Sequence, residues 1–181
     1  SLQQTPADCL IANPPYIRHE LIKEIKPQLK KVFPQTFAGT ADLYTYFYTR
    51  AIELLGPGGM LSFISPNKWF RASYAKKLRC YLAEKCSVVS ITDFMDSPVF
   101  ESATAYPMIF VAQNIKRKEN TVYTETRIEA NSLLNVLEVV KKKGVVLGTS
   151  SLKGKEWSFA DTSTTKVIDK MRESGIPLSE Y

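Results

Sequence analysis

Residues 9–16, which read CLIANPPY, decide the fold. Four apolar residues stop at a polar one and two prolines follow, which predicts a buried parallel strand over residues 9–12 that meets its loop. Each proline fixes one φ angle and removes one backbone donor, so the loop keeps a single shape. We expect that shape to hold the Asn13 amide at one end and the Tyr16 ring at the other.

This loop carries the groups needed to grip a planar molecule that bears an amine. The side-chain carbonyl of Asn13 and the backbone carbonyl of Pro14 are both acceptors. Two acceptors that converge on one –NH2 group orient it and favour the partial positive charge it gains on alkylation. The Tyr16 ring offers a flat surface on which a base can stack. We therefore expect Asn13, Pro14, Pro15 and Tyr16 to be catalytic; the structural alternative is a double-proline turn that only ends a strand.

Composition limits the class of protein. With 181 residues, 44% hydrophobic and 11% aromatic, the chain is long enough for one packed domain, or one and a part. A net charge of +6 is compatible with a polyanionic partner. Three scattered cysteines favour a reduced, cytoplasmic chain, and a single histidine without clustered cysteines argues against a metal site. No apolar run is long enough to cross a membrane.

The hydrophobic pattern predicts the order strand, helix, strand, helix, strand, strand. A weaker helical pattern between residues 19 and 31 is interrupted at Pro27. The connection over residues 96–107 has no helical pattern, so the last two strands should be antiparallel neighbours. After the first strand, the expected elements are a helix over 42–55, a strand over 60–64, a helix over 73–85, and strands over 88–94 and 108–112.

The character of the chain changes after residue 114. A charged turn over residues 116–120 leads to a strand pattern over 121–128 and a helix pattern over 131–143. We therefore divide the chain into residues 1–114 and residues 115–181. The second part reads as a linker and the start of an α+β region.

Further segments resemble a known family. These segments are TADLY at 40–44, PGG at 57–59, SPNKWF at 65–70 and VF at 99–100. In this order they are similar to the gamma-class DNA adenine-N6 methyltransferases of Type II restriction-modification systems, both TaqI-like and Type IIG enzymes. The resemblance covers residues 8–114, and a weaker likeness to the start of the target-recognition region covers residues 157–178.

The resemblance implies a fold and a set of roles. The fold would be the C-terminal half of a Rossmann-like α/β fold that depends on S-adenosylmethionine, with a mixed sheet whose last strand is antiparallel. Asn13 and Pro14 would accept hydrogen bonds from the N6 amine of an adenine flipped out of double-stranded DNA. Tyr16 and Phe100 would pack against that base. No metal is expected for methyl transfer.

The same resemblance places Asn13, Asp42 and Phe47 near the cofactor. Asp42 is alternatively an N-cap, and Phe47 is alternatively part of the apolar face of its helix. Lys68 and Arg71 follow the end of a strand, where they meet DNA phosphates or are ordinary surface charges. Phe100 is alternatively a core residue.

The positions of the glycines indicate whether this chain contains the loop that binds the cofactor. Enzymes of this kind hold it with a glycine-rich loop that follows a strand, and no Gly-x-Gly in that position occurs in these 181 residues. We expect the main binding loop to be absent from this chain, which would be an inactive fragment of a longer enzyme. The likeness to Type IIG enzymes implies that an endonuclease could be fused to it in the full-length protein.

Three other functions stay open at this point. Release-factor glutamine methyltransferases and RNA adenine methyltransferases share the Asn-Pro-Pro-Tyr motif. A non-catalytic nucleic-acid-binding module would also suit the basic balance. More than sixty residues follow Ala112, and the TADLY and PNKW segments are present, which favours DNA adenine.

Overall fold

The computed structural model describes most of the chain. The residues it describes are 5–99, 106–116, 118–128, 135–155, 157–160, 164, 167, 170–171 and 174–176.

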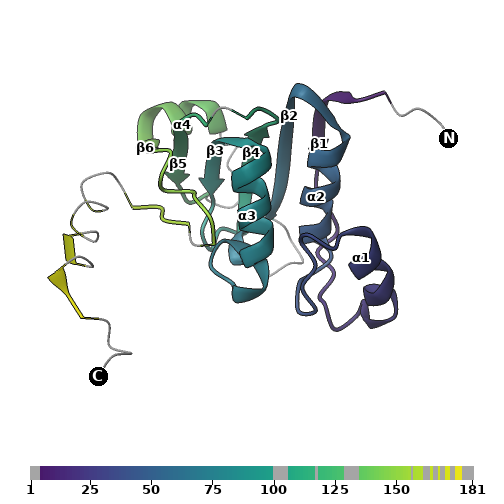
Figure 1. Cartoon of the computed structure of the whole chain (residues 1–181). Coiled ribbons are helices and arrows are strands. Elements are labelled where there is room, and N and C mark those ends of the chain that lie inside the picture. The colour runs from purple at the N-terminus through teal and green to yellow at the C-terminus, as the bar shows by residue number, and fades with distance from the viewer. Residues whose placement is uncertain are drawn as a thin grey trace.

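A six-stranded mixed sheet forms the centre of the fold (Figure 1), in the order β1-β2-β4-β3-β5-β6. β4 lies between β2 and β3 and is antiparallel to both, whereas β1, β2, β3 and β5 all run parallel to one another. The predicted mixed sheet with an antiparallel inserted strand is therefore confirmed. The strands are β1 (Ala7–Ala12), β2 (Leu55–Pro66), β3 (Ser87–Asp93), β4 (Pro107–Gln113), β5 (Thr121–Glu125) and β6 (Val145–Leu147).

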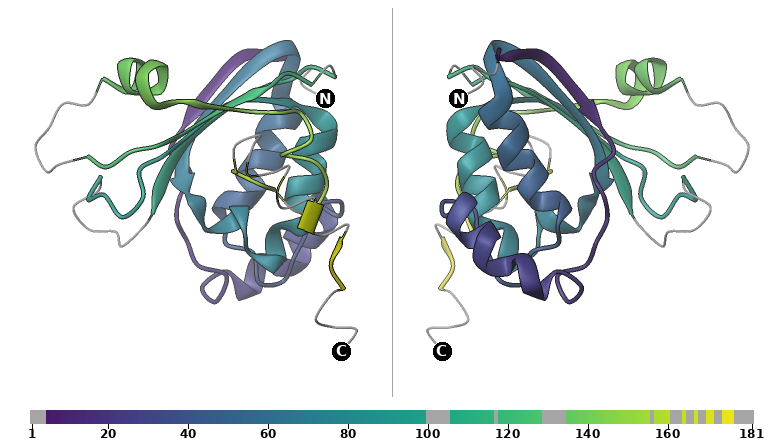
Figure 2. Two further views of the ribbon diagram at one scale, coloured as in Figure 1. Left: turned by 90° about the vertical axis from the view of Figure 1, so that its left-hand side faces the viewer. Right: turned by 90° about the vertical axis from the view of Figure 1, so that its right-hand side faces the viewer.

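Helices cover the sheet unequally. α2 and α3 lie on one side of it and α4 lies on the other (Figure 2). The helices are α1 (Lys26–Val32), α2 (Tyr44–Leu54), α3 (Lys76–Lys85) and α4 (Val136–Lys143), with short 3-10 turns η1 (Lys23–Ile25), η2 (Asn67–Phe70) and η3 (Ser73–Ala75). None of the helices in the described part of the chain combines the length and apolarity that a membrane span requires.

An aromatic cluster fills the core between the sheet and the two helices α2 and α3. Alternate residues of β2 and β4 are buried, because successive side chains of a strand point to opposite faces. The Tyr48 ring of α2 is fully buried and lies 5.1 Å from Phe63, 5.0 Å from Trp69 and 5.4 Å from Phe110, measured between ring centroids. This packing anchors α2 to the sheet, and α2 in turn supports the loop that follows β1.

The first strand is parallel as predicted, but the expectation that it is buried is wrong. β1 is an edge strand of the described sheet, paired only with β2. Leu10 and Ala12 pack against the core, while Ile11 points to the opposite face and is 78% exposed. An apolar run alone cannot show whether both faces of a strand are covered.

Two local boundaries also differ from the prediction. Pro27 does not interrupt a helix; it lies in the first turn of α1, where a missing N–H costs nothing. β2 begins at Leu55 rather than at residue 60, so the PGG segment lies inside it. At Gly59 an added Cβ would lie 2.9 Å from the Ala7 carbonyl oxygen, which explains a residue without a side chain where β1 and β2 approach.

Residues beyond 114 continue the same sheet. β5 pairs in parallel with β3, and β6 pairs with β5. Trp157 also joins the core, with its ring centroid 5.3 Å from that of Trp69. The first strands of the region assigned to residues 115–181 are thus packed with residues 5–99 and 106–114.

Candidate active site

Polar residues stand where the parallel strands end. β1, β2, β3 and β5 all end at one edge of the sheet, since they share one direction. In open α/β sheets this edge is the usual place for a ligand. Asn13 and Asn67 directly follow β1 and β2, and Asp93 and Glu125 are the last residues of β3 and β5.

The loop after β1 presents the Asn13 amide to solvent. Asn13 and Pro15 are exposed, while Pro14 between them is buried. No described residue makes a hydrogen bond with the Asn13 side chain. Its carbonyl is therefore available to an incoming donor, at the end of a strand that is hydrogen-bonded into the sheet.

Tyr16 is held from two sides. Its hydroxyl donates to the backbone oxygen of Ile64 on β2 at 3.3 Å. Its ring lies 6.2 Å from the Tyr44 ring of α2, at an angle of 74°. Half-burial raises the pKa of Tyr16 to about 12, so the hydroxyl stays protonated at neutral pH and keeps donating. These contacts fix the position of the ring relative to Asn13.

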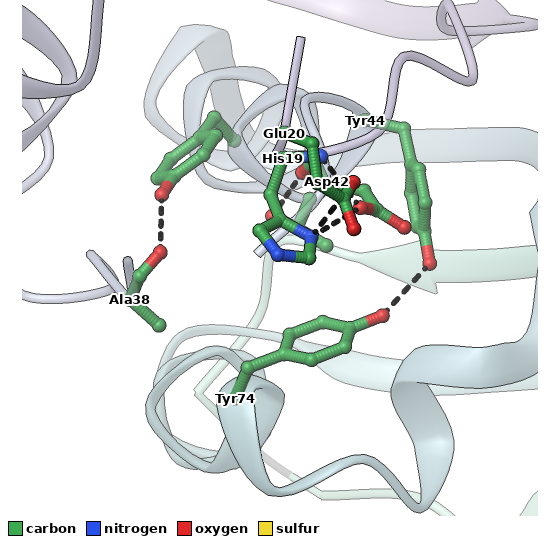
Figure 3. A network of polar contacts seen from close by, with 8 residues as sticks. His19, Glu20, Ala38, Asp42, Tyr44 and Tyr74 are labelled. Carbon is green, nitrogen blue, oxygen red and sulfur yellow. Dashed lines mark hydrogen bonds and ion pairs between the residues drawn. The ribbon is translucent and has the colours of Figure 1, made fainter. Parts of the chain in front are cut away.

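A two-point clasp joins the end of this loop to the start of α2. The Leu43 N–H donates to the Ile17 carbonyl at 2.9 Å, and the His19 N–H donates to Asp42 Oδ1 at 2.9 Å. The His19 Nδ1 atom also lies 3.5 Å from Asp42 Oδ1, and Figure 3 shows the two side chains together. The clasp keeps the Asn13–Tyr16 loop against α2.

The alternative reading of Asp42 as an N-cap is wrong. The N-cap of α2 is Leu43, and no side chain caps the helix. The Asp42 carboxylate bonds His19 instead, and its backbone carbonyl accepts from the Thr45 hydroxyl at 2.8 Å. His19, Glu20 and Asp42 bring their ligand-type atoms within 4.8 Å of one another. The His19 Nδ1 atom lies 3.4 Å from Glu20 Oε2 and 3.5 Å from Asp42 Oδ1, which accounts for this grouping.

Two buried tyrosines of α2, Tyr44 and Tyr48, hydrogen-bond through their hydroxyl groups to residues outside the helix. Tyr44 is 1% exposed, and its hydroxyl lies 3.3 Å from the Tyr74 hydroxyl (Figure 3). The Tyr48 hydroxyl shares a 2.7 Å hydrogen bond with Ser65 Oγ. Burial raises the pKa of both Tyr44 and Tyr48, so these hydroxyls remain neutral. These hydroxyls therefore contribute to packing and hydrogen bonding and do not act as acids at neutral pH.

Phe47 does not lie on the buried face of α2, so the alternative that it belongs to the apolar face of its helix is wrong. The ring is 39% exposed, because α2 turns Tyr44, Tyr48, Ala51 and Ile52 toward the core and position 47 away from it. An exposed aromatic ring in the first turn of α2, next to the clasp, is a surface on which a flat ligand could stack.

The other predicted residues lie in different places. Lys68 and Arg71 are exposed and line a separate cavity after β2. The pKa of Glu20 is lowered mainly by a hydrogen bond from its own backbone, and the positive charges of His19, Arg18 and Lys68 add to the effect. Phe100 lies outside the described residues.

Sequence reasoning missed Asn67, Asp93, Tyr123 and Glu125, which also line that cavity. A signal for the first two exists, since each is a polar residue at the end of an apolar strand, as Asn13 is. Tyr123 and Glu125 carry no such signal, because their strand has an ordinary alternating pattern.

The sequence is similar to a known family and to several curated proteins. The profile of the family described as Eco57I restriction-modification methylase matches residues 3–100. The chain is 36% identical over 112 residues to the Type II methyltransferase M.XhoI of Xanthomonas vasicola, covering 61% of this chain and 20% of that protein. It is 36% identical over 124 residues to M.BstVI of Geobacillus stearothermophilus, covering 65% and 22%. The chain thus spans about a fifth of these relatives.

Solved structures share the fold. A candidate class I S-adenosylmethionine-dependent methyltransferase from Listeria monocytogenes superposes with a TM-score of 0.58 at 17% identity, over 78% of this chain and 42% of that one. The DrdV–DNA complex gives 0.53 at 14% identity, over 78% and 17%. The type IIG restriction endonuclease BpuSI gives 0.50 at 21% identity, over 66% and 15%.

Proposed function

The chain belongs to the Eco57I restriction-modification methylase family, and on this premise we propose that it carries the acceptor half of a DNA adenine-N6 methyltransferase site. The full-length enzyme transfers a methyl group from S-adenosylmethionine to an adenine extruded from double-stranded DNA. The observation that carries the proposal is the exposed Asn13 amide at the carboxyl end of β1, three residues from the doubly held Tyr16 ring.

Asn13 and Pro14 act on the target amine. Their carbonyl oxygens accept its two N–H groups, which orients the nitrogen lone pair and stabilises the positive charge that grows on it during transfer. No strong base is required, because the amine attacks first and loses its proton afterwards. Pro15 keeps the loop in the shape that holds both acceptors in place.

Tyr16 positions the base. Its ring stacks on the extruded adenine, and its contacts with Ile64 and Tyr44 remove the need to order it on binding. Phe100 packs on the base from another side. The adenine then sits at the edge where the Asn13 loop meets α2.

Three residues are assigned to the cofactor, which supplies an electrophilic methyl group when bound. The exposed ring of Phe47 fits a stacking role toward its adenine, and Asn13 lies at the strand end where the two substrates meet. Asp42 fits less completely, because one of its oxygens already accepts from His19. The other oxygen remains able to accept a hydrogen bond.

The wider assignment follows the relatives. M.XhoI and M.BstVI are Type II methyltransferases, and BpuSI is a type IIG enzyme that shares the fold. We assign the full-length protein to a Type II system, of the IIG kind that joins methyltransferase and endonuclease, acting in the cytoplasm. Lys68 and Arg71 contact DNA phosphates, and residues 115–181 begin the part that recognises the target sequence.

Nucleoside analysis tests the proposal. The full-length protein is incubated with S-adenosylmethionine and, separately, with double-stranded DNA, RNA and a release-factor protein, and the products are digested and analysed by mass spectrometry. We expect N6-methyladenine in DNA alone. Methylated glutamine, methylated RNA, N4-methylcytosine, or no methyl transfer to any of the three would contradict it.

A further inference from the structure

A second candidate site is a cavity at the carboxyl ends of β3 and β5. Its volume is about 460 Å³, and it is lined by residues from η2, the end of β3, β5 and the segment around Phe159. Neither Asn13 nor Tyr16 is among its lining residues. The proposed methyl-transfer site therefore does not account for it.

Two carboxylates from neighbouring strands line the cavity, buried Asp93 and exposed Glu125. Asp93 and Glu125 are register partners on the parallel strands β3 and β5. Asp93 is 6% exposed, and its two oxygens accept from the Asn67 side-chain amide and the Met95 N–H, each at 2.8 Å. Glu125 Oε1 accepts from the Tyr123 hydroxyl at 2.7 Å. Both carboxylates are thus held in fixed positions.

Backbone strain and repulsion between neighbouring charges accompany this arrangement. Met95 has a φ of 57°, in the left-handed region that a residue with a long side chain rarely adopts. Burial raises the pKa of Asp93, and the neighbouring Glu125 adds to the rise. Such strain and charge crowding are typical of binding sites rather than of ordinary loops.

Each carboxylate can accept further hydrogen bonds. Glu125 Oε2 has no partner among the residues that the structure describes, and each Asp93 oxygen has a second lone pair. A ligand that presents two adjacent N–H groups would satisfy these acceptors. A ligand that presents an acceptor there would be repelled.

The walls are aromatic. The Phe159 ring lies 5.0 Å from the Phe70 ring and 4.8 Å from the Tyr123 ring, and all three line the cavity. Tyr106, which also lines it, is 56% exposed. These rings would take up a flat group by stacking.

Cations also belong to the lining. Lys68, Arg71 and Arg127 are exposed there, and Arg127 pairs with Asp96 at 3.2 Å. Burial raises the pKa of Asp93 and of Tyr123, and the positive charge of nearby Arg71 partly offsets each rise. An anionic group on the same ligand would therefore meet Lys68 or Arg71.

We propose that this cavity binds a guanine nucleotide, with the base edge on Asp93 and Glu125, the ring on the aromatic wall and the phosphate at Lys68 and Arg71. Guanine presents N1–H and N2–H donors side by side on its Watson–Crick edge, whereas adenine and cytosine place a ring acceptor beside their single amino group. The inference rests on the proposed function for the source of the nucleotide, which is a non-target guanine of the bound DNA that is unpaired from its cytosine, so that its Watson–Crick edge is free.

Calorimetric titration of the full-length protein with guanosine, adenosine and cytidine monophosphates tests the proposal. Guanosine monophosphate should bind at least about tenfold more tightly than the other two, the range expected for a base edge read by paired hydrogen bonds. Glu125→Gln should weaken its binding by about tenfold. The control Glu84→Gln changes an exposed glutamate that pairs only with Lys85 in the described chain, and it should leave binding within about twofold.

A second variant separates the phosphate from the base. Lys68→Met should weaken binding of guanosine monophosphate but not of guanosine. Equal binding of the three nucleotides, or unchanged binding by a folded Glu125→Gln protein, would overturn the proposal. Normal DNA methylation without nucleotide binding would overturn this inference alone, and nucleotide binding without any methyl transfer would overturn the proposed function alone.

Discussion

The Tyr16 hydroxyl donates a hydrogen bond to the backbone oxygen of Ile64, 48 residues further along the chain, at 3.3 Å. This contact ties the aromatic end of the catalytic loop to the strand next to it. Together with the Tyr44 ring beneath, it makes the stacking surface part of the sheet rather than a free side chain. The proposed stacking of adenine on this ring therefore starts from a preorganised position.

Tyr16 variants can separate the ring from the hydroxyl. Tyr16→Ala removes the stacking surface and should weaken binding of DNA with an extruded target base by about 1–3 kcal/mol. Tyr16→Phe keeps the ring but loses the hydroxyl with its hydrogen bond to Ile64, and should change affinity by about 0.5–1.5 kcal/mol at most. Fluorescence titration with DNA that carries a mismatched target adenine measures both. Equal affinity of Tyr16→Ala and the wild type would rule out stacking.

Asp42 can bind the cofactor or hold the Asn13–Tyr16 loop in place. Measuring kcat and cofactor affinity in the Asp42→Ala variant distinguishes the two roles. The hydrogen bond from His19 predicts that Asp42→Ala loosens the clasp, so that kcat falls by about tenfold or more. The proposed contact of its second oxygen with the cofactor predicts that the affinity for S-adenosylmethionine falls as well. Glu20→Ala, which removes the other carboxylate near His19 but keeps the clasp hydrogen bonds, is the matched control. A selective loss of cofactor affinity in Asp42→Ala would instead assign the residue to the cofactor.

Phe47 is exposed, which makes its role easy to isolate. Phe47→Ala should leave the free energy of unfolding within about 0.5 kcal/mol of the wild type, as for most surface changes. Its affinity for S-adenosylmethionine should fall by about 1–3 kcal/mol, the value of an aromatic stacking contact. The exposed Val32, at the end of α1, serves as control through Val32→Ala. A cofactor affinity equal to that of the control would remove Phe47 from the site.

The buried carboxyl of Asp93 should make stability depend on pH. Its folded-state pKa is raised above 3.8, mainly by burial, so the native state holds the proton more tightly than the unfolded state. The stabilisation is complete below 3.8 and is lost as pH rises through the folded-state value.

The variant Asp93→Asn lacks this titration. As the pH rises from 3.8 through the folded-state pKa of Asp93, the free energy of unfolding of the wild type should fall relative to that of the variant, as measured by urea unfolding. Glu84→Gln, which changes an exposed glutamate that pairs with Lys85, is the surface control. A difference between wild type and Asp93→Asn that stays constant with pH would refute the assignment.

The order of elements could be predicted because it depends on local patterns. Alternating apolar residues, helix-length spacing and the lack of a crossover helix before β4 were sufficient to place the antiparallel strand next to β3. The position of Asn13 after β1 followed from the same reasoning. These features depend on residues that are close in sequence.

Other features depend on contacts between distant residues, which a local pattern does not carry. Ile11 and Phe47 are apolar, yet nothing near them in sequence shows that the described chain leaves them exposed. Asp42 has the residue type of an N-cap, and only the folded loop brings His19 to it instead. The second cavity joins residues between 67 and 159, so its carboxylate pair becomes visible only once β3 and β5 are paired.

The most direct test of the account is the rate of methyl transfer by Asn13→Ala in the full-length protein. Single-turnover transfer from labelled S-adenosylmethionine to adenine in duplex DNA should fall by about 100-fold or more, since one preorganised acceptor for the developing charge is lost. Circular dichroism should show an unchanged fold, because the Asn13 side chain is exposed and bonds no described residue. A folded variant that methylates adenine at close to the wild-type rate would contradict the account.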